Sequence, residues 1–254
     1  MFRRALFLPI LLLTAAVGLE FAAPAAASAQ AAMPTGFLNR TVEQDGATMP
    51  YVVYVPRNYK PEGKWPVVMF LHGSGERGAD GLKQSEVGLG RAVRMFPERF
   101  PAIVIFPQCA ESLRWSDQQA ALAMKALDKT VEEYHGDPNR LYLTGLSMGG
   151  AGSWYLATMF PRKFAAVASL CGRFEIPAIT DKLKDVPTWI VVGDQDSATT
   201  VAFAREASAA MKAAGSTRMR YTEYPGVPHN CWDKFYAEAD FATWLFQQSL
   251  SADK

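Results

Sequence analysis

The chain has 254 residues, of which about half are apolar and a fifth are charged, a composition that excludes a disordered or fibrous protein. The formal net charge is +1 and the basic residues are scattered, so charge gives no reason to expect a nucleic-acid partner. The length suits one large domain with a sizeable core.

The N-terminus is typical of a secretory signal peptide. Arg3 and Arg4 precede an apolar run over residues 5–19, and a stretch rich in small residues follows. The sequence Ala-Ser-Ala at residues 27–29 fits the small-x-small rule, so we expect cleavage after Ala29. The run is too short to favour an uncleaved membrane anchor, and no later segment is apolar enough to cross a bilayer. We therefore predict a signal peptide over residues 1–29 and a secreted or periplasmic protein.

After this segment, predicted strands alternate with predicted helices. Most of the strands are apolar runs without polar alternation, which indicates burial on both faces. The strands are expected at residues 48–56, 66–71, 102–106, 140–145, 164–170, 188–192 and 219–224, and the helices at residues 117–134, 149–160, 200–214 and 232–248. Such alternation predicts one α/β domain over residues 30–254, with a mostly parallel sheet and helices on both faces. Residues 75–100 are expected to cover one edge of the site.

Residues 145–149 match the pattern G-x-S-x-G, with Ser147 at its centre. The pattern directly follows a predicted buried strand and precedes a predicted helix, where a sharp turn exposes the serine above the sheet. Glycines are needed there because side chains would collide with neighbouring backbone. The helix N-terminus directs its amide groups at developing negative charge. We therefore predict that Ser147 is a nucleophile, and this context disfavours a chance match.

A serine nucleophile needs a base, and His229 is the best placed of three histidines. It lies in a loop of turn-forming residues after the last predicted strand. His135 fits a helix end, and His72 fits a structural role in the loop that stabilises the oxyanion.

The orienting acid should lie between serine and histidine in the sequence. Asp196 is preferred, because Gly-x-x-Asp lets the chain turn before the carboxylate points back, and Asp194 stays open as the alternative.

Two backbone amides are expected to stabilise the oxyanion, those of Met148 and of Ser74. Gln108, Trp115 and Trp232 fall on loops expected near the substrate pocket. Trp115 lies in a polar stretch and is suited to stacking on an aromatic or sugar group. Packing is the alternative role for Trp115, and for Trp232, at the start of the last predicted helix, packing beneath the histidine loop is favoured over contact with a ligand.

The cysteines are Cys109, Cys171 and Cys231, and their odd number leaves at least one of them free or paired with another chain. Cys171 and Cys231 each fall near a segment of the predicted site and are candidate neighbours in space. Burial as small apolar residues is the alternative. No cysteine or histidine cluster has the spacing of metal ligands, so no metal centre is expected.

Five motifs follow one another in a characteristic order. They are LHGSGERG (71–78), PQC (107–109), GLSMGG (145–150), GDQD (193–196) and HNCWD (229–233). Together they resemble the bacterial α/β-hydrolase esterases described as predicted peptidase or phospholipase/carboxylesterase-like, which are relatives of feruloyl and polyhydroxybutyrate-depolymerase-like esterases. The resemblance covers residues 51–246. It implies an α/β-hydrolase fold with little or no lid, the triad Ser147, Asp196 and His229, and an ester-cleaving enzyme without a cofactor.

The expected function is the hydrolysis of carboxylic esters through an acyl-enzyme, on short-chain or aryl (feruloyl-like) esters that are small molecules or derived from a polymer. A serine peptidase of the prolyl-oligopeptidase type is one alternative, although such enzymes usually carry a large extra domain that this chain lacks. A non-catalytic binding protein with a hydrolase fold is another, and the complete triad argues against it. No nucleic-acid partner and no membrane span after signal cleavage are expected.

Overall fold

The computed structural model describes residues 33–250. The predicted signal peptide and its cleavage site lie outside these residues, and so both remain predictions. Within residues 33–250, no helix is long and apolar enough to cross a membrane.

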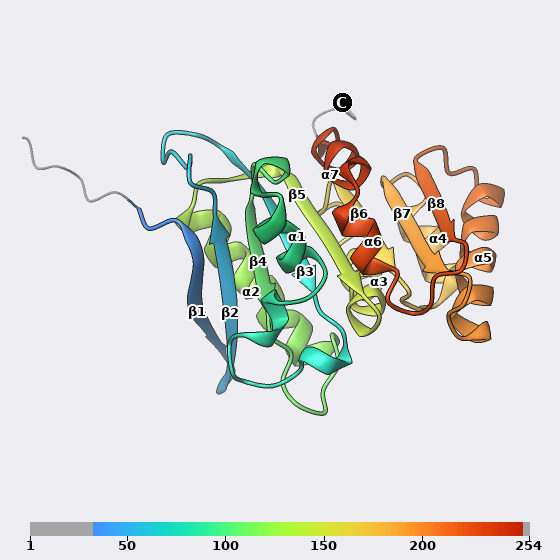
Figure 1. Cartoon of the computed structure of the whole chain (residues 1–254), viewed down its shortest axis with the longest axis horizontal. Helices are drawn as coiled ribbons and strands as arrows, with labels where there is room; N and C mark the ends of the chain where they lie inside the picture. Colours follow the sequence, from blue (N-terminus) through green and yellow to red (C-terminus); the bar gives the residue numbers. More distant parts are fainter. Residues whose placement is uncertain (1–32, 251–254) are drawn as a thin grey trace, which may run out of the picture. The chain divides into compact units, whose positions relative to one another are not determined.

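One sheet of eight strands forms the centre of the domain (Figure 1). The strands are β1 (Gly36–Gln44), β2 (Ala47–Val55), β3 (Trp65–Leu71), β4 (Ile103–Pro107), β5 (Gly136–Leu146), β6 (Ala166–Leu170), β7 (Thr188–Gly193) and β8 (Met219–Tyr224). Their order across the sheet is β1-β2-β4-β3-β5-β6-β7-β8. The strands from β4 to β8 in this order are parallel, whereas β1 and β2 form an antiparallel hairpin at one edge. All six parallel strands therefore end at the same edge of the sheet.

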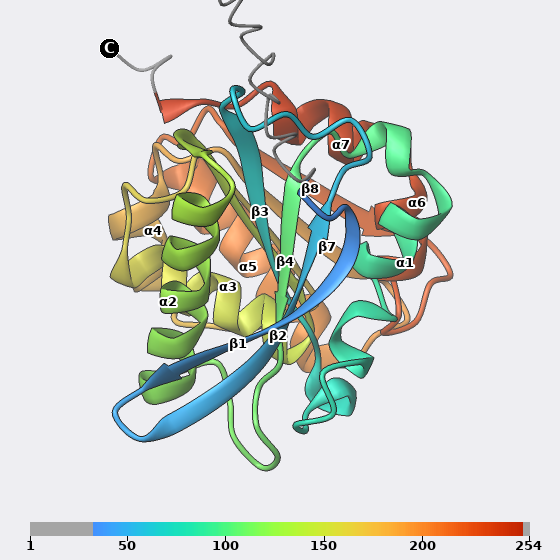
Figure 2. The ribbon, with the colours of Figure 1, turned by 90° about the vertical axis from the view of Figure 1, so that its left-hand side faces the viewer.

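Helices cover both faces of the sheet (Figure 2). They are α1 (Leu89–Met95), α2 (Asp117–Glu133), α3 (Met148–Met159), α4 (Ile176–Leu183), α5 (Ala198–Ala213), α6 (Trp232–Ala237) and α7 (Ala239–Phe246), with short 3-10 turns at Ser74–Glu76, Lys83–Ser85 and Pro97–Arg99. The helices α1, α6 and α7 lie on one face, and α2 to α5 lie on the other. This is the α/β-hydrolase type of architecture, and the predicted fold class is confirmed.

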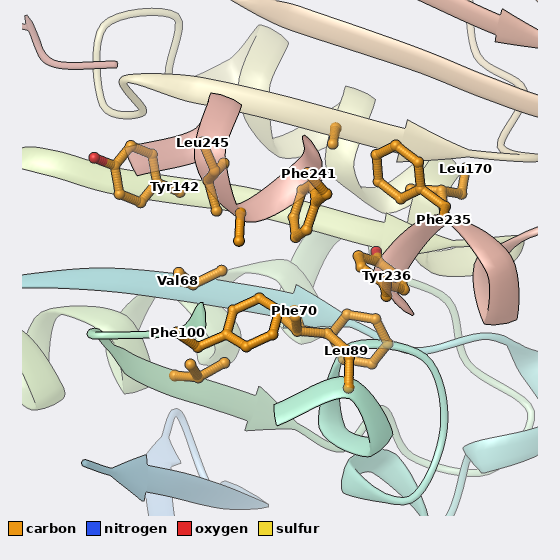
Figure 3. Close-up of a cluster of buried hydrophobic side chains, with 14 of the residues drawn as sticks. Val68, Phe70, Leu89, Phe100, Tyr142, Leu170, Phe235, Tyr236, Phe241 and Leu245 are labelled. Carbon is orange, nitrogen blue, oxygen red and sulfur yellow. The ribbon is translucent and has the colours of Figure 1, made fainter. Parts of the chain in front are cut away.

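The core beneath α1, α6 and α7 is dominated by aromatic side chains (Figure 3). Phe70 of β3 packs edge-on against Tyr236 of α6, and Phe235 packs against Phe241 of α7. All four side chains are almost fully buried. Aromatic pairs in such geometry add to the stabilisation that burial alone provides, so this face anchors the C-terminal helices on the sheet.

The predicted helix over residues 232–248 is two helices. Glu238 has an extended backbone between α6 and α7, and its side chain accepts a hydrogen bond of 2.5 Å from the hydroxyl of Tyr224. The apolar spacing continues across this break, which is why the sequence pattern did not reveal it. The prediction also missed β1, α1 and α4.

Candidate active site

Ser147 lies at the turn between β5 and α3 in a backbone conformation that side chains rarely adopt, with φ 53° and ψ −115°. Its amide donates to the carbonyl of Leu170 at 2.8 Å, which fixes the turn against the neighbouring strand. A side chain at Gly149 would overlap the carbonyl of Leu71, so the helix can approach the sheet this closely only with glycine there. The strained turn holds the serine above the carboxyl end of the sheet.

His229 and Asp196 reach this serine from loops after two other strands. His229 Nε2 lies 2.9 Å from Ser147 Oγ, and His229 Nδ1 lies 2.6 Å from Asp196 Oδ2. The Asp196 side chain is 4% exposed and the His229 side chain 47%. A buried carboxylate therefore holds one ring nitrogen, while the opposite nitrogen faces the serine at the solvent-accessible edge.

Asp194, the alternative acid, takes part in a different contact. Its Oδ1 accepts a hydrogen bond of 2.7 Å from the amide of Gly226, in the turn that follows β8. Gly226 has φ 71°, a conformation that favours glycine. Asp194 thus ties down the start of the loop that carries His229, whereas Asp196 contacts the imidazole itself.

The surroundings of His229 raise its pKa to about 9. The neighbouring Cys171 sulfur is the largest cause, the hydrogen bond and charge of Asp196 act in the same direction, and partial burial opposes both. The Cys231 thiol beside Cys171, together with burial, raises the pKa of Cys171 strongly. Cys171 is therefore a neutral thiol near neutral pH, and Asp196 is the charged neighbour of His229 there.

His72 holds the loop that faces Ser147. It is fully buried, its Nδ1 donates to the carbonyl of Gly73 at 2.6 Å, and its Nε2 accepts from the amide of Cys109 at 3.0 Å. Trp115 Nε1 donates to the His72 carbonyl at 3.0 Å. Burial lowers the pKa of His72 to about 4, so the ring is neutral and acts as a fixed spacer.

The loop that follows His72 passes directly beside the serine. A side chain placed on Gly73 would lie 3.6 Å from Ser147 Cβ and 2.9 Å from a methyl group of Leu146. Ser74 and Met148, the residues chosen for their amides, both line the cavity that contains Ser147. Both amides therefore stay candidates for the oxyanion-binding pair, and their role remains a prediction.

This site cavity has a volume of about 600 Å³. Its lining residues are Ser74, Arg77, Arg114, Ser147, Met148, Ala151, Cys171, Arg173, Phe174, Thr200 and His229. The three arginines were not among the predicted site residues. Two of them stand in or near segments that carried predictions, since Arg77 lies in the LHGSGERG motif and Arg173 follows Cys171 by two residues. A larger cavity of about 750 Å³ lies beside β1 and β2, and its lining does not include Ser147 or His229.

The residues predicted to bind substrate lie elsewhere in the site region. Gln108 is buried and holds the loop at residues 76–81, because its amide donates to the Glu76 carbonyl and to Asp80 and its oxygen accepts from Gly81. Trp115 is also buried, against His72. Neither side chain lines the site cavity, so we do not propose that they contact substrate.

Trp232, the third of these predicted residues, packs edge-on against His229 with ring centroids 5.3 Å apart. It is absent from the lining of the site cavity and packs against the apolar core. The contact supports the ring of His229 from the side of α6.

Cys171 and Cys231 are neighbours, with their sulfur atoms 3.0 Å apart. Both thiols are buried, and the Cys171 sulfur also lies 3.2 Å from the carbonyl oxygen of His229. The ligand atoms of Cys171, Asp196 and His229 lie within 4.8 Å of one another, a spacing that a metal ion could bridge. Two of these three residues, Asp196 and His229, already contact each other through a hydrogen bond.

Comparison with known proteins identifies the family. The family model Esterase, described as "Putative esterase", matches residues 43–254. This chain belongs to the esterase family. Membership confirms the predicted resemblance to esterases.

Individual relatives of this esterase-family chain are also named as esterases. A thermostable esterase of known structure is 32% identical, with a TM-score of 0.78 over 84% of this chain and 63% of its own. A feruloyl esterase module from Clostridium thermocellum, complexed with sinapinate, is 17% identical, with a TM-score of 0.65 over 82% of this chain and 86% of its own, and shares the fold. The bifunctional acetylxylan esterase/xylanase XynS20E of Neocallimastix patriciarum is 24% identical over 63% of this chain and 23% of its own length. The chain thus spans less than two thirds of the first and third of these relatives.

Proposed function

We propose that this chain hydrolyses carboxylic esters by acyl transfer to Ser147, with His229 as the base and Asp196 as the acid that orients it. The observation that carries the proposal is the pair of contacts at His229, 2.9 Å to Ser147 Oγ and 2.6 Å to Asp196 Oδ2. A serine hydroxyl is a weak nucleophile unless a base accepts its proton, and this arrangement provides one.

Each residue has a defined step. Ser147 Oγ attacks the carbonyl carbon of the ester while His229 Nε2 takes the hydroxyl proton. The backbone amides of Met148 and Ser74 stabilise the oxyanion, and His229 returns the proton to the leaving alcohol. Water then attacks the acyl-enzyme, His229 takes a proton from it, and the carboxylic acid leaves as Ser147 regains its hydrogen. Asp196 stabilises the imidazolium in both halves.

The open cavity above Ser147 and the names of the relatives favour short-chain and aryl esters, such as acetyl and feruloyl esters, as substrates. The substrate is either a small molecule or an ester released from a polymer. We further propose that the chain is secreted or periplasmic, on the evidence of its N-terminal sequence.

The test is turnover of 4-nitrophenyl acetate and methyl ferulate by the mature protein, with peptide anilides as amide substrates. We expect the wild type to turn over the esters and to be labelled by a fluorophosphonate probe. In Ser147→Ala, turnover should fall by about 10⁴-fold or more and the labelling should be lost. Ser153→Ala is the matched control, since Ser153 lies on α3 and donates to the Gly149 carbonyl outside the cavity. Undiminished turnover in Ser147→Ala would overturn the mechanism. Preferential cleavage of the anilides would favour a peptidase, and a wild type that the probe does not label would favour a binding protein.

A further inference from the structure

The site cavity has an unusual charge. Three of its lining residues are the arginines Arg77, Arg114 and Arg173, and none is an aspartate or glutamate. The chain as a whole is balanced, with 26 basic and 25 acidic residues. A guanidinium stays protonated at every ordinary pH, so the cavity carries three fixed positive charges beside Ser147.

These charges are not neutralised by carboxylates of the described chain. Within residues 33–250, no ion pair joins any of the three arginines to an aspartate or glutamate. Asp196, the acid of the proposed triad, is committed to His229 Nδ1 and its side chain is nearly buried. Glu76 is the nearest other carboxylate, since a side chain placed on Gly73 would lie 3.2 Å from its Oε2, but it pairs with none of the three arginines. An anion that enters the cavity therefore meets guanidinium groups that no carboxylate of the described chain pairs with directly.

The arginines differ in how they are held. Arg77 is half-buried, and its Nε donates to the Ser74 carbonyl at 3.0 Å, so it also shapes the loop at Ser74. Arg114 and Arg173 are exposed and come from different loops, one before α2 and one after β6. Their flexible side chains can close on a ligand from two directions, and the planar fork of each matches the two oxygens of a carboxylate.

We propose that the esters cleaved at this site carry a carboxylate group in addition to the ester, and that Arg114 and Arg173 bind it. The inference rests on the proposed function, since it assigns the substrate class of the same site. A neutral ester would leave these charges solvated and unused, whereas an ester with a free carboxylate gains charge-assisted hydrogen bonds while its carbonyl lies at Ser147. The same positive potential speeds the encounter with an anionic substrate at low salt.

The test compares substrates that differ only in this charge. For a carboxylate on the acyl side, the pair is 4-nitrophenyl hydrogen adipate and 4-nitrophenyl methyl adipate. For a carboxylate on the alcohol side, it is 4-acetoxybenzoate and methyl 4-acetoxybenzoate. We expect the anionic member of at least one pair to have a kcat/KM about tenfold or more above its neutral partner, falling as sodium chloride rises from 0.05 to 0.5 M.

The arginine variants locate the effect. The double variant Arg114→Gln/Arg173→Gln should lower kcat/KM for the preferred anionic ester about tenfold or more and leave the neutral partner within about twofold. Arg162→Gln is the matched control, since it removes the same charge from an exposed position outside the cavity lining. It should leave both esters unchanged.

The outcomes separate this inference from the proposed function. Equal kcat/KM values in both pairs, or a preference that the double variant retains, would overturn the carboxylate assignment while leaving the esterase intact. Absence of turnover for all four esters, together with no labelling by a fluorophosphonate probe, would overturn the proposed function itself.

Discussion

His72 and His229 both follow a β-strand and stand close to Ser147, yet their environments give them opposite properties. Burial lowers the pKa of His72 to about 4, while the surroundings of His229 raise its pKa to about 9. Both ring nitrogens of His72 hydrogen-bond to backbone groups, whereas those of His229 contact a serine hydroxyl and a carboxylate. The burial and the hydrogen-bond partners of an imidazole, and not its position after a strand, therefore decide whether it can transfer protons.

The largest expected effect concerns the acid that holds His229. Asp196→Asn should lower kcat/KM by about 10³- to 10⁴-fold, because an amide no longer stabilises the imidazolium or fixes the required tautomer. Only the unprotonated ring can act as a base, so wild-type kcat/KM should rise with pH through the raised pKa of His229. In the variant the rising limb should move to lower pH, since the charge of Asp196, which acts with Cys171 to raise the pKa of His229, is gone. Profiles of kcat/KM from pH 5 to 10 measure both effects.

Asp194→Asn is the matched control for this experiment. The asparagine oxygen can still accept from the amide of Gly226, so the loop should keep its place and kcat/KM should stay within about tenfold of wild type. A larger loss of kcat/KM in Asp194→Asn than in Asp196→Asn would make Asp194, and not Asp196, the acid that orients His229.

The second prediction uses the buried histidine. Because the folded pKa of His72 is about 4 and the unfolded value about 6.5, the unfolded chain binds an extra proton between these limits. The stability that depends on the neutral ring is therefore complete above pH 6.5 and is lost as pH falls through 4, by about 3 kcal/mol. Urea unfolding from pH 4 to 7 should show this slope in wild type.

His72→Asn removes the titrating group and tests the assignment. The variant should be less stable at pH 7, where two backbone contacts are weakened, and its stability should fall less steeply between pH 6.5 and 4. A variant with the wild-type slope would show that another group is responsible for the acid sensitivity.

The smallest expected effect concerns the thiol beside His229. Cys171 lines the site cavity, but the neighbouring Cys231 thiol and burial raise its pKa far above neutral, so little thiolate exists at pH 8. Iodoacetamide at pH 8 should leave ester turnover unchanged, whereas a fluorophosphonate should abolish it. Inactivation that parallels alkylation of Cys171, followed by mass spectrometry, would contradict the neutral state of this thiol.

The parallel strands and the turn at Ser147 could be predicted from the sequence, because both depend on local patterns. Apolar runs mark strands that are buried on both faces, and the glycines around Ser147 are required by its turn. β8 was predicted with the same bounds that the structure has. The predictions failed where a distant partner decides the outcome. The break at Glu238 depends on the hydroxyl of Tyr224, which comes from another element.

The same reason separates the site residues that the sequence predicted from those it missed. Gln108 and Trp115 were expected near the pocket because of the loops on which they lie. In the structure, Gln108 donates a hydrogen bond to the carbonyl of Glu76, and Trp115 donates one to the carbonyl of His72. Arg114 and Arg173 belong to no catalytic motif, and only the folded chain brings them to one cavity. Convergence of exposed side chains from separate loops leaves no pattern in the sequence.

The contributors to the proposed triad follow three different strands, β5, β7 and β8, and three helical crossovers, α3, α4 and α5, separate the first strand from the last. None of the distances at His229 can form until β8 has joined the edge of the sheet. Such non-local pairing is slow compared with helix formation. Recovery of ester turnover during refolding would therefore lag behind recovery of the helical circular dichroism signal. The return of ester turnover would mark the time at which the sheet is complete.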